Sequence, residues 1–94
     1  MRRYRVVVPP GVAKTIRALH PTLRRRIRAA LDAIAEDPMR SVPLRDELAG
    51  LRRVRVQRHR IAFAIDPSAR TVHVLYVGPR TTIYQELGSM RRRG

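Results

Sequence analysis

Apolar positions alternate with polar ones over three consecutive segments in the second half of the chain, and alternation is the period of a β-strand. β-branched residues are common in all three segments, as they are in strands generally. Residues 66–70, between the second segment and the third, have the composition of a turn. The pattern therefore predicts an antiparallel meander of three strands over residues 52–57, 60–66 and 71–77.

The first half of the chain carries a short strand pattern followed by the 3.6-residue period of amphipathic helices. Residues 4–8 are rich in β-branched side chains and stop at two prolines, which predicts a strand. Apolar side chains then recur at helical spacing over residues 12–19. A second helix can begin at Pro21 or Thr22 and ends at Asp37, before a proline. Its apolar stripe is formed by Leu23, Ile27, Ala30, Leu31 and Ile34.

Residues 39–50 follow neither period, so they predict an irregular connection that three leucines attach to the core. Residues 81–90 predict a short final helix, and residues 91–94 a flexible tail. The expected fold class is α+β, with an N-terminal strand, an αα-hairpin, a three-strand antiparallel meander and a short C-terminal helix. Residues 1–94 are expected to form a single domain, because domains are typically about 100–150 residues long.

The strongest global signal is charge. The chain has 21 Lys and Arg residues against 7 acidic ones, which gives a net charge of +14. Such an excess favours polyanionic partners, with nucleic acid ahead of acidic proteins and anionic membranes. The absence of cysteine is compatible with a reducing compartment. No apolar run approaches the roughly 20 residues that span a bilayer, so we expect a soluble cytoplasmic protein with no membrane partner.

Strand alternation sorts the arginines of the predicted meander onto one face. Arg53 and Arg55 lie on the face opposite Val54 and Val56. On the next strand, Arg60 shares a face with two small alanines, which leave room above the sheet. The pattern predicts a concave basic groove, and arginine is well suited to holding phosphates there.

Several other kinds of chemistry have no support in the sequence. The three histidines are far apart, and no cysteine or carboxylate stands at a metal-ligand spacing from them. The five glycines are scattered rather than gathered in a phosphate-binding loop. No serine–histidine pair indicates a nucleophilic triad. We therefore expect no metal and no cofactor, and are left with arginine, tyrosine and histidine acting on a phosphodiester.

Four segments in this order carry a resemblance to a known family. They are LAGLRRVRV at residues 48–56, HRIAF at residues 59–63, VGPR at residues 77–80, and Tyr84. In their order and spacing the chain resembles the RelE/ParE toxin superfamily, whose members are small basic toxins of bacterial toxin–antitoxin pairs. The resemblance extends over nearly the whole chain, from Tyr4 to about Leu87.

The resemblance implies one of two activities. The RelE branch cleaves mRNA on the ribosome without a metal, whereas the ParE branch poisons DNA gyrase. In a RelE-type reaction the 2′-hydroxyl of the substrate attacks the adjacent phosphate, and arginines stabilise the charge that develops. The tyrosine stacks on a base or assists proton transfer. The resemblance assigns catalysis to Arg55, Arg60, Arg80 and Tyr84, and we assign RNA binding to Arg53 and Arg58.

The chain departs from the RelE pattern where proton transfer is concerned. Lysines are typical of that branch at the positions of Arg53 and Arg55, and an arginine effectively cannot lose its proton to act as a base. His59 is the nearest alternative in sequence, but alternation places it on the core side of its strand. The general base is therefore left open. Tyr84 as a helix-packing residue is the structural alternative to its catalytic role.

The sequence thus favours a ribosome-dependent mRNA endonuclease that a cognate acidic antitoxin neutralises. A gyrase inhibitor without nuclease activity is the alternative, and a toxin-like protein that only binds RNA or its partner is a third. The expected partners are the antitoxin, mRNA and the ribosome, or DNA gyrase in the alternative.

Overall fold

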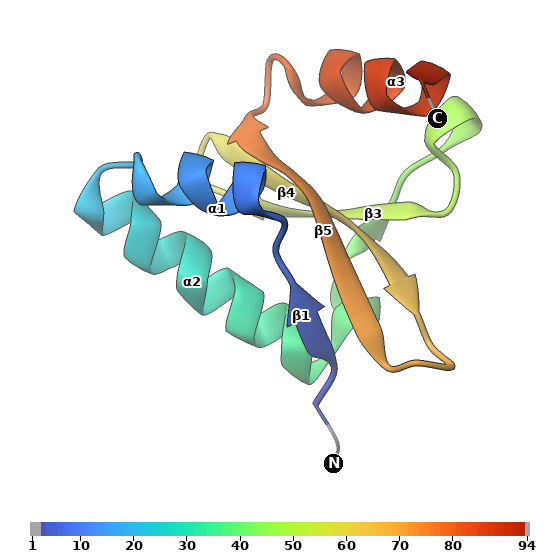
Figure 1. Cartoon of the computed structure of the whole chain (residues 1–94), viewed down its shortest axis with the longest axis horizontal. Helices are drawn as coiled ribbons and strands as arrows, with labels where there is room; N and C mark the ends of the chain where they lie inside the picture. The colour runs from blue at the N-terminus through green and yellow to red at the C-terminus, as the bar shows by residue number, and fades with distance from the viewer. Residues whose placement is uncertain (1–2, 94) are drawn as a thin grey trace.

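The computed structural model describes residues 3–93, including every side chain in that range except those of Tyr84 and residues 91–93. Figure 1 shows a twisted sheet with α1 and α2 together on one side and α3 crossing it at one end. No described helix is long and apolar enough to cross a membrane. The helices are α1 (Pro10–Arg17), α2 (Pro21–Glu36) and α3 (Ile83–Arg93), with short 3-10 turns η1 (Pro38–Arg40) and η2 (Asp46–Leu48).

The sheet has five strands in the order β1-β5-β4-β3-β2, and only the β1–β5 pair is parallel. This arrangement confirms the predicted α+β class and the antiparallel meander. Its edge strand β2 was not predicted, because two residues are too few to show a period. The strands are β1 (Arg5–Val7), β2 (Val42–Pro43), β3 (Leu51–Val56), β4 (His59–Asp66) and β5 (Thr71–Pro79).

The helix boundaries follow the local signals in the sequence. Pro21 stands in the first turn of α2, and the Nδ1 atom of His20 accepts a hydrogen bond from the Thr22 N–H at 3.2 Å. The helix stops at Glu36, before Asp37 and Pro38. At the other end of the chain, α3 continues through Arg93. Residues 91–93 are therefore helical, the flexibility predicted for them stays a prediction, and Gly94 lies outside the described residues.

Two apolar clusters pack on the two faces of the sheet. The larger one joins α1 and α2 to the sheet, and Ile27, Ile61 and Phe63 have no exposed surface within it. The smaller one joins Ile83 and Leu87 of α3 to the opposite face of the sheet. Leu44, Leu48 and Leu51 belong to this second cluster, which confirms that the irregular connection is attached to the core.

The turn between β4 and β5 is closed by a carboxylate. Asp66 Oδ1 accepts hydrogen bonds from the Ala69 N–H at 3.1 Å and the Ser68 hydroxyl at 2.9 Å. These donors lower the pKa of Asp66, the Ala69 amide having the largest effect. The turn predicted for residues 66–70 is confirmed, and its acid serves structure.

A β-bulge changes the faces of β5 halfway along. Phe63 pairs with Val74 and Ala62 with Tyr76, so Leu75 is an extra residue between them. Leu75 and Tyr76 therefore both contact the cluster under α3, and Val77 returns to the cluster under α1 and α2. The bulge brings the Tyr76 side chain to the face of the sheet that carries the arginines.

Candidate active site

Four arginines from three parts of the fold line one pocket of about 270 Å³. Arg53 and Arg55 come from β3, Arg60 comes from β4, and Arg80 follows β5. Ile83 of α3 supplies an apolar wall. We call this cavity the arginine pocket. The basic groove that the sequence predicted is therefore present, and it also includes Arg80.

The sheet register explains why these side chains meet. Arg55 pairs with Arg60 across β3 and β4, and Arg60 pairs with Gly78 across β4 and β5. Because paired residues lie on one face, these three positions form a row across the sheet. A Cβ atom on Gly78 would collide with the Tyr76 phenol, so a larger residue at this position would displace the tyrosine ring.

Arg60 is the anchored member of the arginine pocket. Only 4% of its surface is exposed, and its Nη1 atom donates to the carbonyls of Gln57 at 3.1 Å and His59 at 3.0 Å. A buried charge is tolerated when such hydrogen bonds satisfy it. The carbonyls hold one edge of the guanidinium in place, which is the preorganisation that an anion site needs.

The other three arginines are not neutralised. No described carboxylate lies within 4.0 Å of the guanidinium of Arg53, Arg55 or Arg80. The Nε atom of Arg53 is buried without a hydrogen-bond partner among the described residues, and the Nε atom of Arg55 donates to the Gln57 carbonyl at 3.3 Å. Like charges held together, and a buried donor left without an acceptor, both cost stability. An anion bound in the pocket would relieve both costs.

Tyr76 holds the turn that carries Arg80, and the sequence interpretation missed it. Its hydroxyl lies 2.7 Å from Thr82 Oγ1, and the backbone N–H of Arg80 donates to the Arg58 carbonyl at 2.9 Å. The i, i+2 spacing of Tyr76 and Gly78 on one strand could have indicated the contact. Detecting it also requires the bulge, which alternation alone does not predict.

The remaining predicted residues lie outside the pocket or outside the described side chains. Arg58 is exposed and is not among the residues that line the pocket; its contribution there is the carbonyl that accepts from Arg80. The side chain of Tyr84 lies outside the described residues. His59 and His73 do not line the pocket either. Among the described residues, no group of three His, Asp or Glu side chains could hold a metal ion.

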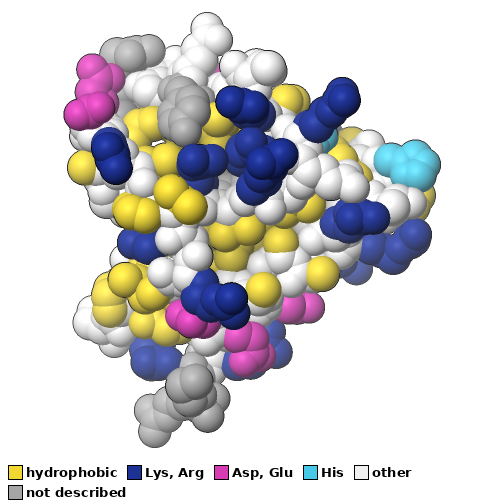
Figure 2. Space-filling model, turned by 180° about the vertical axis from the view of Figure 1, so that it is seen from behind, with side chains coloured by type: hydrophobic (Ala, Val, Ile, Leu, Met, Phe, Trp, Pro, Cys, Tyr) yellow, Lys and Arg dark blue, Asp and Glu magenta, His cyan; other side chains and the backbone are white. Residues whose placement is uncertain are grey.

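The wider surface has the same charge character. On the face shown in Figure 2, arginine and lysine side chains gather in the upper half, and most acidic side chains lie apart from them. The described ion pairs join Arg3 to Asp32 at 3.6 Å and to Glu36 at 3.4 Å. Asp32 and Glu36 therefore neutralise Arg3 near the N-terminus, and they do not neutralise the arginine pocket.

The family of the chain follows from its sequence. Residues 10–84 match a family profile described as the ParE toxin of the type II toxin–antitoxin system, parDE. The chain belongs to this family, and so to the RelE/ParE toxin superfamily. It is thus a toxin of a type II toxin–antitoxin system. Comparison with curated protein sequences gives no match.

Solved structures of RelE toxins have the same fold. A chain of the RelBE2 toxin–antitoxin complex from Mycobacterium tuberculosis is 28% identical, with a TM-score of 0.77 over 85% of this chain and 94% of that one. A mutant of Escherichia coli RelE in the free state is 18% identical, with a TM-score of 0.76 over 96% and 97%. A chain of the archaeal RelE–RelB complex from Pyrococcus horikoshii is 21% identical, with a TM-score of 0.70 over 83% of this chain and 96% of that one. The last two similarities establish the fold alone.

Proposed function

We propose that this toxin is an endoribonuclease that cleaves mRNA on the ribosome by attack of a ribose 2′-hydroxyl on the adjacent phosphate. The observation that carries the proposal is the arginine pocket, in which three guanidinium groups lack a described counter-ion. A protein gains nothing in stability from such a cluster. Its chemistry fits a phosphodiester, because guanidinium groups bind phosphate oxygens through paired N–H donors.

The reaction balances without a group supplied by a cofactor. The 2′-oxygen forms a bond to phosphorus, and the bond from phosphorus to the 5′-oxygen breaks. The products are a 2′,3′-cyclic phosphate and a 5′-hydroxyl, and the proton lost by the 2′-hydroxyl is matched by one gained by the leaving oxygen. The phosphorane-like transition state carries an extra negative charge, which the arginines stabilise more strongly than they stabilise the substrate.

The positions of the arginines support a division of roles. Arg60 is held by two carbonyls, so it presents a fixed donor to the phosphate. Arg53 and Arg55 stand beside it on β3, and Arg80 approaches from the turn after β5. The lining residues are arginines and an isoleucine, none of which serves as a base near neutral pH. The general base therefore lies outside these lining residues and stays unassigned, and the free protein should cleave RNA slowly.

Charge also supports the partners. A chain of net charge +14 attracts both RNA and an acidic protein. Two of the structural relatives are toxins in complex with antitoxins. We propose that an acidic antitoxin covers the arginine pocket in the cytoplasm and that its degradation exposes the pocket to the ribosome-bound message.

Inhibition of DNA gyrase is the second candidate. It is favoured by the family profile, which is that of ParE toxins, and by the absence of a neutral-pH base among the described lining residues. In that case the arginine pocket would bind an acidic surface of the target rather than a phosphodiester.

Brief induction in cells separates the two candidates. Transcript ends and DNA breaks are mapped in the same samples within minutes. The nuclease produces cuts at a fixed position within codons, because only the ribosome presents the message in that register. If gyrase-linked DNA breaks appear early and transcripts stay intact, the nuclease proposal is wrong and inhibition of gyrase takes its place.

A further inference from the structure

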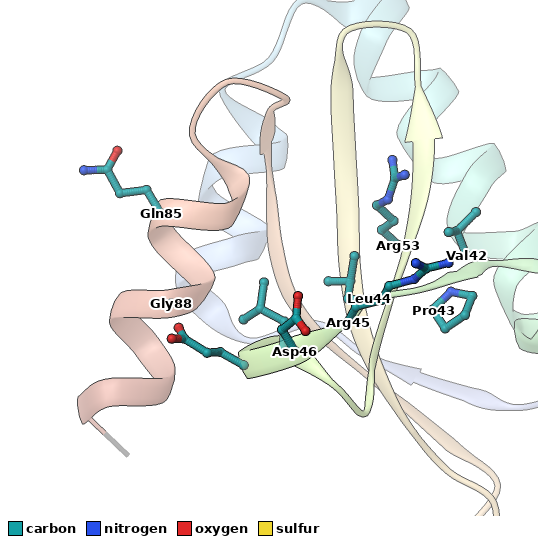
Figure 3. A pocket seen from close by; sticks show the side chains of 10 residues that line it. Val42, Pro43, Leu44, Arg45, Asp46, Arg53, Gln85 and Gly88 are labelled. Carbon is teal, nitrogen blue, oxygen red and sulfur yellow. The ribbon is translucent and has the colours of Figure 1, made fainter.

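A second cavity lies beside the arginine pocket and shares a wall with it. It has a volume of about 770 Å³, within the range of small-molecule sites. The segment from β2 to η2 forms one side, and Gln85 and Gly88 of α3 form the other, as Figure 3 shows. Arg53 lines both cavities. We call this second cavity the side pocket.

The side pocket differs from its neighbour in chemistry. Val42, Pro43 and Leu44 give it an apolar wall, whereas arginines dominate the arginine pocket. Its charged lining residues are two acids, Asp46 and Glu47, and two arginines, Arg45 and Arg53. The two carboxylates form no ion pair within 4.0 Å with a described side chain. Asp46 and Glu47 offset the charges of Arg45 and Arg53 in this lining, so the side pocket attracts phosphate less strongly than the arginine pocket does.

A nucleobase can contact both the apolar wall and the carboxylates of this cavity. Its faces are apolar enough to lie against the valine, proline and leucine wall. The amino groups of adenine, cytosine and guanine donate hydrogen bonds, and carboxylates accept from such groups. Base and phosphate belong to one nucleotide, so a phosphate in contact with Arg53 brings a base to the adjoining cavity.

We infer that the side pocket binds the base next to the scissile phosphate and prefers a base with an amino group over uracil. The inference rests on the proposed nuclease function and adds the residues that set its sequence preference. Asp46 and Glu47 are the specificity-determining residues. This role gives a function to two consecutive acids in a strongly basic chain.

The test maps cleavage sites for the parent and for Asp46→Asn and Glu47→Gln. The Asp46 backbone has a φ of 56°, and asparagine tolerates this left-handed region, so the first variant should fold. At one position beside the cut, the parent should favour amino-bearing bases over uracil by about tenfold, the value of one well-placed base contact. Each variant should lose most of that preference while still cutting in codon register.

Asp32→Asn is the matched control, since it removes the same charge from the exposed surface of α2. It should leave the base preference unchanged. Binding of short 2′-O-methyl oligonucleotides of A, C or U provides a second readout that does not require cleavage, with thermal unfolding as the check on folding. The parent should bind the A and C oligomers more tightly than U, and Glu47→Gln should reduce the difference.

Three results overturn the inference in distinguishable ways. If the parent cuts in codon register and both variants retain its base preference, the side-pocket inference is overturned and the nuclease proposal stands. A parent that makes no cuts in RNA removes the nuclease proposal and the side-pocket proposal together. Variants that change affinity for the antitoxin while keeping the base preference assign the side pocket to the partner protein.

Discussion

The two faces of β3 and β4 differ in how many of their side chains stabilise the fold. The face under α1 and α2 is apolar, and Ile61 and Phe63 are completely buried there. The other face carries Arg53 and Arg55, whose charges have no described counter-ion. Burial of one large apolar side chain stabilises a fold by roughly 1.5–3 kcal/mol, whereas clustered like charges oppose folding. The first face therefore contributes mainly to the fold, whereas the second combines the smaller apolar cluster under α3 with arginines that fit the anionic partner proposed above.

Arg52 and Arg53 make the same contrast between two consecutive residues. The Nε atom of Arg52 donates to Ser41 Oγ at 2.7 Å, and its Nη2 atom donates to the carbonyls of Ser41 at 2.8 Å and Met39 at 3.2 Å. These bonds tie β3 to η1. Arg53 points to the other face, and its Nε atom lacks a partner. Two consecutive arginines thus have different roles: Arg52 holds the structure on one face, and Arg53 remains available for ligands on the other.

The largest expected effect is on the apolar face. Phe63→Ala should lower the free energy of unfolding by about 3–5 kcal/mol, because it leaves a cavity at a fully buried position. Chemical denaturation measures this loss. The comparison fails if Arg55→Ala, the matched truncation on the other face of the same strand pair, destabilises the protein as much.

The next effect is on activity. Arg80→Ala should reduce RNA cleavage and growth inhibition by about 10²–10³-fold, as expected when one preorganised donor to a transition state is lost. Arg80 is exposed after the strand ends, so its removal should leave the melting temperature unchanged. Arg80→Lys should restore part of the activity, since a point charge replaces the planar fork. Full toxicity of Arg80→Ala at equal soluble expression would exclude Arg80 from the site.

The Arg52 and Arg53 pair provides a smaller and sharper test. Arg52→Ala should destabilise the protein by about 1–3 kcal/mol, since the Ser41 and Met39 acceptors lose a charged donor. Arg53→Ala should leave stability equal or higher and should weaken activity. Thermal melts and cleavage rates of both variants are compared side by side. Equal loss of stability in the two variants would mean that Arg53 also has a structural role.

Most of the fold was predictable because its signals are local. The alternation of Val54 and Val56 with the arginines fixed the two faces, and the prolines and caps fixed α2 to within a residue or two. The meeting of the strand arginines followed from the same alternation. The contribution of Tyr76 did not, because it depends on a bulge that one sequence period cannot reveal. The edge strand β2 and the side pocket depend on long-range packing of an irregular segment.

The smallest expected effect concerns Tyr76, which joins the two regions by fixing the turn between the sheet and Arg80. Tyr76→Phe keeps the ring over Gly78 and removes only the hydroxyl that meets Thr82 at 2.7 Å. A hydrogen bond of this kind contributes about 0.5–1.5 kcal/mol. We therefore expect cleavage to fall by roughly three- to tenfold, mainly in kcat, because the mobile turn presents Arg80 less often. A double-mutant cycle with Arg80→Ala checks this reason: Tyr76→Phe should have little further effect once Arg80 is absent. A full additional loss in the double mutant would show that Tyr76 acts independently of the turn.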